Sequence, residues 1–172
     1  MPPGMNILTV DLAFSTLIFG IAARLYLVPR LPTLEPRSVL LPILLLHSFR
    51  HLGLMFLAPG AIYAGMPSAF AYPAAFGDFL AALLAIAAIP LVAAGSPGAK
   101  PVVWVFNVEG TLDLLLAIVL ATAYNAPPYM GPTYWIPAFW VPSLLVTHYL
   151  TFGLLRREWG VAAGADPGGA GV

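Results

Sequence analysis

Charged residues are scarce in this sequence. Only 8% of its 172 residues are Asp, Glu, Lys or Arg, and 60% are hydrophobic, whereas a soluble domain carries about 25% charged residues. This number of charges is too small to cover a water-exposed surface. The composition therefore predicts that lipid surrounds the protein. Basic and acidic residues balance at seven each. The sequence therefore lacks the basic surface that binds nucleic acid, and we expect no nucleic-acid partner.

Several chemical devices are also missing from the sequence. Cysteine is absent, which excludes disulfides, thiolate metal ligands and a cysteine nucleophile. No Walker A, GxGxxG or GxSxG motif occurs, so we expect neither nucleotide hydrolysis nor serine-hydrolase chemistry. The first residues carry no basic group and Asp11 interrupts their apolar run. We therefore expect the first apolar segment to be retained as a signal anchor and not cleaved as a signal peptide.

Long apolar runs dominate what is present. Five segments reach the roughly 20 residues that a helix needs to cross a bilayer, and Pro/Gly-rich joints such as GSPGAKP separate them. Lipid cannot satisfy open backbone groups, and the runs do not alternate as barrel strands do, so helices are predicted. The sequence thus predicts an all-α integral membrane protein with one transmembrane domain, residues 1–158, and a disordered Gly/Ala-rich tail, residues 159–172. The predicted spans are residues 6–28, 38–58, 73–94, 102–123 and 134–155.

The basic residues predict an orientation. In a five-span arrangement, six of the seven fall on one side: Arg24, Arg30, Arg37, Lys100, Arg156 and Arg157. The seventh, Arg50, lies inside the second span. Because cytoplasmic loops carry an excess of Lys and Arg, we expect the N-terminus outside and the C-terminus in the cytoplasm. The expected location is a bacterial-type inner (plasma) membrane, crossed several times.

Ionisable residues inside the predicted spans are the candidate functional residues. A charge at mid-bilayer costs at least a few kcal/mol, yet the spans contain His47, Arg50, His51, Asp78, Glu109, Asp113 and His148. On an α-helix, His47, Arg50 and His51 share one face, as Glu109 and Asp113 share another. We expect these faces to meet in a ligand, ion or proton-relay site. With Asp11, four carboxylates face one arginine, so an acid must be protonated, a histidine charged, or a cation bound.

Metal or haem binding is an alternative interpretation of the same residues. His47 and His51 are spaced like the histidines of HExxH, but Ser48 replaces the glutamate, so the protease motif is absent. A metal site made by His47, His51 and Asp113, or Asp78 in its place, would suit zinc, iron or manganese. His47 and His148, at similar expected depth, could instead hold a haem. The sequence fixes no cofactor.

Three classes of function stay open. The intramembrane ionisable groups favour a proton- or cation-linked transporter or channel. The second class is a membrane-embedded enzyme or redox protein for a lipophilic substrate, with His47, His51, Glu109 and Asp113 as its acid–base or metal set. The third is an accessory subunit of a larger membrane complex. Independently of these classes, a unit of this size is expected to be able to form a homodimer. A structural role is the simplest alternative, because Arg50 paired with an acid could merely lock helices together.

Overall fold

The computed structural model describes residues 7–157 and 159, and these residues form helices and connecting turns without a strand. Five helical segments are long and apolar enough to cross a membrane: Ile7–Leu27, Pro36–Leu57, Ser68–Ala93, Ala99–Ala123 and Gly131–Leu155. The predicted all-α class and the five segments are confirmed at this level. The later four begin two to five residues earlier than predicted, most of all the third, in which Pro73 lies inside the helix and not at its start. The predicted tail, residues 159–172, lies outside the described residues except for Trp159.

Three of the five segments combine different helix types. The segments are α1 (Ile7–Ala22) with the π-helical turn η1 (Ala23–Leu27), α2 (Pro36–Ser48) with the 3-10 helix η2 (Phe49–Leu57), α3 (Ser68–Ala93), α4 (Ala99–Ala123), and α5 (Val141–Leu155). Before α5 come the 3-10 turns η3 (Pro127–Tyr129) and η4 (Gly131–Tyr134) and the π-helical turn η5 (Ile136–Trp140).

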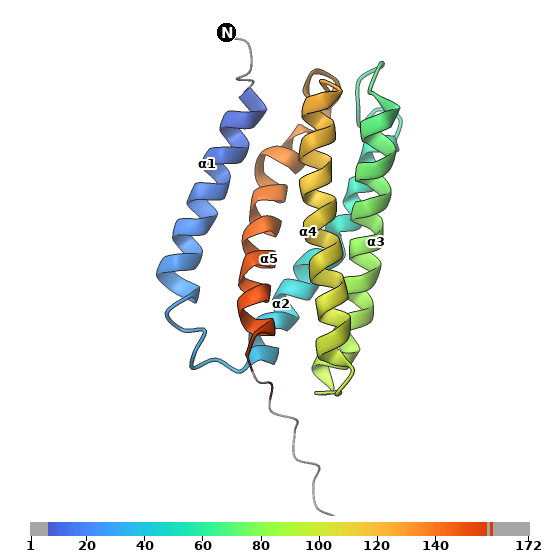
Figure 1. Cartoon of the computed structure of the whole chain (residues 1–172). Coiled ribbons are helices and arrows are strands. Elements are labelled where there is room, and N and C mark those ends of the chain that lie inside the picture. The colour runs from blue at the N-terminus through green and yellow to red at the C-terminus, as the bar shows by residue number, and fades with distance from the viewer. Residues whose placement is uncertain (1–6, 158, 160–172) are drawn as a thin grey trace, which may run out of the picture.

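The helices form one bundle in which successive helices run in opposite directions (Figure 1). Helix α3 packs against α4, α2 and η2, whereas α1 lies at the edge and contacts mainly α5 and η5. Alanines at 74, 75, 81, 82, 85 and 88 make up much of the buried face of α3. Such small side chains let neighbouring helices approach closely.

The second segment changes its helical pitch in the middle of the bundle. From Phe49 to Leu57 the chain is a 3-10 helix of nine residues, although such helices seldom exceed three or four residues. Its buried residues are Arg50, Gly53 and Phe56, at intervals of three. Because a 3-10 helix has three residues per turn, these residues lie in one line along the inner face. His51 falls on a different face and is exposed.

Two apolar cores enclose a polar layer. One core includes Phe56, Phe70 and Leu114, toward the end of the bundle where α1 begins, and the other includes Leu44, Phe106 and Leu154. Apart from Thr133 of η4, the buried polar residues of the described chain lie in the intervening stretches of the same helices: His47, Arg50, Asp78, Asn107, Asp113, His148 and Thr151. The fold thus holds a set of polar side chains between two layers that exclude water.

Candidate functional site

Arg50 is the centre of the buried polar layer. Its side chain, 1% exposed, reaches from η2 to two other helices. Its Nε donates to Asp78 Oδ1 of α3 at 2.7 Å, and its Nη2 donates to Asp113 Oδ2 of α4 at 2.5 Å. Its Nη1 donates to the carbonyl oxygen of Gly110 at 3.2 Å. One guanidinium therefore joins three segments of the bundle through charge-assisted hydrogen bonds.

His148 of α5 completes the coordination of the guanidinium. Its Nε2 lies 3.3 Å from Arg50 Nη1, and its Nδ1 lies 2.7 Å from Asn107 Oδ1. Because a guanidinium has only donors, Nε2 must accept this hydrogen bond, so the proton of a neutral ring is on Nδ1. That proton is then donated to Asn107 Oδ1, while Asn107 Nδ2 donates to the carbonyl oxygen of His148 at 3.3 Å. The contacts therefore assign His148 as a neutral imidazole with a fixed tautomer.

His47 lies against His148, with ring centroids 4.3 Å apart. Its Nε2 is 2.9 Å from Thr147 Oγ1, and that hydroxyl is already within hydrogen-bond distance of the carbonyl oxygens of Ser143 and Leu144. The hydroxyl proton therefore goes to a carbonyl, and His47 Nε2 is the donor in its contact with Thr147. His47 Nδ1 is buried without a hydrogen-bond partner. It carries a lone pair that can accept a proton.

Three glycines make the cluster fit. A Cβ added at Gly53 of η2 would collide with the Asp78 carboxylate, and one at Gly77 of α3 would collide with the Asp113 carboxylate. A Cβ at Gly110 of α4 would lie 2.6 Å from Arg50 Nη1 and 2.7 Å from His148 Nε2. These distances are shorter than those that real Cβ atoms show. The absence of a side chain at each glycine therefore leaves the space that the neighbouring polar groups occupy.

Glu109 lies at the margin of this cluster. It is half-buried and precedes Asp113 by one helical turn of α4. Its Oε2 is buried and has no hydrogen-bond partner. Glu109 therefore adds to the margin of the cluster a buried carboxylate oxygen that accepts no hydrogen bond.

The structure assembles five of the predicted site residues: His47, Arg50, Asp78, Asp113 and His148, with Glu109 beside them. His51 does not join this cluster. It is exposed and its Nδ1 lies 2.8 Å from the carbonyl oxygen of Ser48, because the 3-10 helix moves the fourth residue off the face of His47. Asp11 is also separate from the cluster and accepts a hydrogen bond from Tyr134 Oη at 3.1 Å.

The residues do not fit the predicted cofactors. The proposed metal set of His47, His51 and Asp113 is not assembled, since His51 is on the surface. Within the described part of the chain, no group of three or more His, Cys, Asp or Glu residues could hold a metal ion. The two histidines of the haem alternative are in ring contact, and both nitrogens of His148 face protein partners. No space for a macrocycle exists between them.

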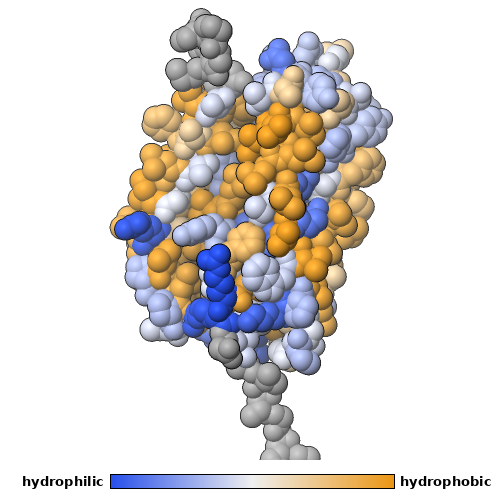
Figure 2. Space-filling model, viewed as in Figure 1, coloured by the Kyte–Doolittle hydropathy of each residue, from blue (hydrophilic) through white to orange (hydrophobic). Residues whose placement is uncertain are grey.

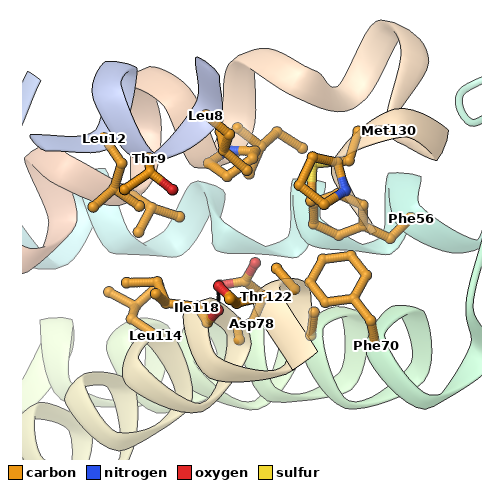
Figure 3. Close-up of a pocket in the computed structure, with 17 residues that line it drawn as sticks. Leu8, Thr9, Leu12, Phe56, Phe70, Asp78, Leu114, Ile118, Thr122 and Met130 are labelled. Atoms are coloured by element: carbon orange, nitrogen blue, oxygen red, sulfur yellow. Dashed lines mark hydrogen bonds between the residues drawn. The ribbon is translucent and has the colours of Figure 1, made fainter. Parts of the chain in front are cut away.

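A cavity of about 130 Å³ adjoins the cluster. Figure 3 shows its lining side chains, among them Leu8 and Thr9 of α1, Phe56 of η2, Asp78 of α3 and Leu114 of α4. Most lining residues are apolar. Asp78 is the one ionisable residue among the described residues that line the cavity. The cluster therefore has one side that meets an apolar space.

Asn107 and the three glycines were not identified as site residues from the sequence. Asn107 is the one amide within the apolar run PVVWVFNVEG, which is a weak signal by itself. Its role depends on a side chain of α5 that is distant in the sequence.

Comparison with known proteins places the chain in a family. Residues 7–156 match the model of the family described as "Domain of unknown function (DUF8737)", and the chain belongs to this family. No curated protein matches the chain, and no solved structure matches it.

Proposed function

We propose that this member of the DUF8737 family is an integral membrane protein, and that its buried cluster is the proton-binding site of a proton-linked transporter. In this proposal the five helices cross a bacterial-type inner membrane. Large apolar side chains such as Phe14, Ile18, Leu112 and Val119 are more than half exposed, and Figure 2 shows apolar side chains over most of the visible face. Such a surface suits lipid contact.

The charge distribution along the bundle supports an orientation. The strongly hydrophilic residues in Figure 2 gather toward the end of the bundle at which α5 ends. Arg37, Lys100 and Arg157 belong to this end and hydrogen-bond to backbone carbonyl oxygens there. By the excess of basic residues in cytoplasmic segments, that end is cytoplasmic and the N-terminus is outside.

The observation that carries the proposal is the shortage of positive charge in the cluster. One guanidinium serves the carboxylates of Asp78 and Asp113, and Glu109 adds a buried oxygen without a donor. An uncompensated negative charge in the bilayer interior costs several kcal/mol. A bound proton is the smallest cation that can neutralise this charge. The His, Asp and Glu side chains of the described residues are not arranged to hold a metal ion. The cluster therefore holds a proton at rest.

Arg50 distinguishes a transporter from an open channel. A guanidinium does not deprotonate in proteins, so protons cannot pass through it. Its fixed positive charge also opposes a continuous file of hydronium ions, as a pore-lining arginine does in proton-excluding channels. Protons instead bind the acids on one side of Arg50 and the free Nδ1 of His47 on the other. Movement between the two sides then requires a conformational change, which is the behaviour of a transporter.

Infrared difference spectroscopy tests the bound proton. In purified protein at neutral pH, the carboxylic-acid C=O band should be present in the wild type. It should weaken in both Asp78→Asn and Asp113→Asn, because each variant removes one of the two carboxylates that share Arg50. Asp11→Asn is the matched control, since Asp11 lies outside the cluster and contacts Tyr134; this variant should keep the band. A wild type without the band would refute the proposal.

Transport is tested in liposomes that contain a pH-sensitive dye. An imposed membrane potential should drive proton uptake in wild-type vesicles and in Asp11→Asn vesicles. Asp113→Asn should reduce the uptake to that of empty vesicles. Equal uptake in Asp113→Asn and the wild type would exclude Asp113 from the proton-binding site.

A further inference from the structure

The cavity beside Asp78 has the size of a small-molecule site. Its volume is about 130 Å³, and an engineered apolar cavity of roughly 150 Å³ in another protein binds benzene. The cavity lies between α1, η2, α3, α4 and the stretch from Pro127 to Val141. It can therefore take a molecule with the bulk of a single six-membered ring, and it is too small for a lipid.

The walls of the cavity are apolar apart from the carboxylate of Asp78 and the hydroxyls of Thr9 and Thr122. Apolar side chains, among them Leu8, Phe56, Phe70 and Met130, face the space in Figure 3. The hydroxyl of Thr122, a further lining residue, donates to the carbonyl oxygen of Ile118 in its own helix. A ligand held here would contact hydrocarbon over most of its surface and meet one carboxylate.

Asp78 retains the capacity to bind a donor. Arg50 Nε donates to its Oδ1, and a carboxylate accepts about four hydrogen bonds in total. Its Oδ2 lies against the backbone of Gly53, where a Cβ would displace it. Gly53 thus allows the carboxylate to stand between the guanidinium and the cavity. Donors on a ligand could reach it from the cavity side.

The charge of the cluster selects the class of ligand. Arg50 with ionised Asp78 and Asp113 leaves an excess of one negative charge, and a monovalent cation makes this set neutral. An anion would add to the excess, and a neutral molecule would leave it unchanged. We infer that the cavity binds a small primary alkylammonium ion, with its hydrocarbon body in the cavity and its ammonium group donating to Asp78.

Ligand and proton then compete for the same negative charge. The ammonium ion enters already charged, and the proton held by the cluster leaves for the solvent, so charge is conserved in the site. This exchange rests on the proposed function, whereas binding of the ammonium ion does not. The transporter would accordingly carry one positive charge at a time, either a proton or a small amine cation.

Isothermal titration calorimetry of the full chain in nanodiscs tests the inference. Cyclohexylammonium is the probe, and cyclohexanol is its neutral counterpart of similar shape. The cation should bind at least about tenfold more tightly, the effect of a hydrogen bond to a charged group. Titrations in two buffers with different ionisation enthalpies report proton release, which should accompany binding of the cation. Equal affinities for the two probes, or no binding of either, would overturn the inference.

Two variants locate the site. Ala121→Leu places a larger side chain at a cavity-lining position away from the cluster, and it should weaken binding of both probes at least about tenfold. The matched control Ala87→Leu changes an exposed residue of α3 and should leave both affinities unchanged. Asp78→Asn should remove the preference for the cation. An unaltered preference in that variant would overturn the role of Asp78.

The outcomes separate the two proposals. Cation binding that Asp78→Asn weakens but that releases no proton would support the ligand site and contradict the resting proton of the proposed function. A C=O band in the infrared spectrum together with no cation binding would support the proton site and overturn the inference about the ligand.

Discussion

Replacing Arg50 by glutamine tests whether the guanidinium is required to neutralise the cluster. The variant keeps a polar side chain of intermediate length but removes the charge. Asp78 and Asp113 then lose their only ion-pair partner among the described residues. Glutamine has one amide group and cannot reach both acids in the way that the guanidinium does.

The expected magnitude follows from two competing accounts. If only interhelical hydrogen bonds were lost, four contacts at about 0.6 kcal/mol each would cost roughly 2 kcal/mol. Removing one partner of a buried ion pair costs about 3–5 kcal/mol, because it leaves a buried charge uncompensated. We expect a loss of at least about 3 kcal/mol for Arg50→Gln. The triple variant with Asp78→Asn and Asp113→Asn should regain most of this loss, since no charge then remains in the pair.

Unfolding by a denaturing detergent, followed through the fluorescence of the four tryptophans, measures these differences. His51→Gln is the matched control, because His51 is exposed on the same segment; its effect should stay within about 0.5 kcal/mol. The Arg50→Gln variant should also lose stability as pH rises, because its folded state must hold protons on acids that the unfolded chain releases. A loss below about 1 kcal/mol, or a triple variant no more stable than the single one, would refute the reasoning.

Two further predictions concern the groups around the guanidinium. Gly77→Ala should destabilise the protein by about 1–3 kcal/mol, because its Cβ would collide with the carboxylate on α4. Gly20→Ala, where nothing lies within 4 Å of the added Cβ, should not destabilise it in the same unfolding assay. Nitrogen NMR should find the proton of the neutral His148 ring on Nδ1. Asn107→Ala should cost about 1–3 kcal/mol but leave the proton on Nδ1, because Arg50 still donates to Nε2; a proton on Nε2 in the wild type would contradict the assignment.

The sequence predicted the five segments and the main members of the cluster for simple physical reasons. Length and apolar composition determine which segments can cross a membrane. Charged groups within such segments must pair, so an ion pair between Arg50 and an acid was expected from residue types alone. The third helix begins five residues before the predicted start, at Ser68, and Pro73 lies inside it.

The position of His51 could not be predicted because it depends on helix type. An α-helix would place it on the face of His47, and a 3-10 helix does not. Residue types in FRHLGLMFL do not reveal this change of pitch, since the same residues are common in α-helices. The roles of Asn107 and Gly77 were also inaccessible, because each depends on a side chain brought close by a different helix.

The change of pitch has a consequence for length. A 3-10 helix rises about 2.0 Å per residue and an α-helix about 1.5 Å, so nine residues in the former conformation gain roughly 4 Å of reach. Figure 1 shows that α2 and η2 rise obliquely across the bundle while α3 and α4 stand nearly upright. A slanted path between two parallel surfaces is longer than a perpendicular one. The stretched turns thus bring the path length of a tilted segment of 22 residues close to that of straighter neighbours of 25 and 26 residues.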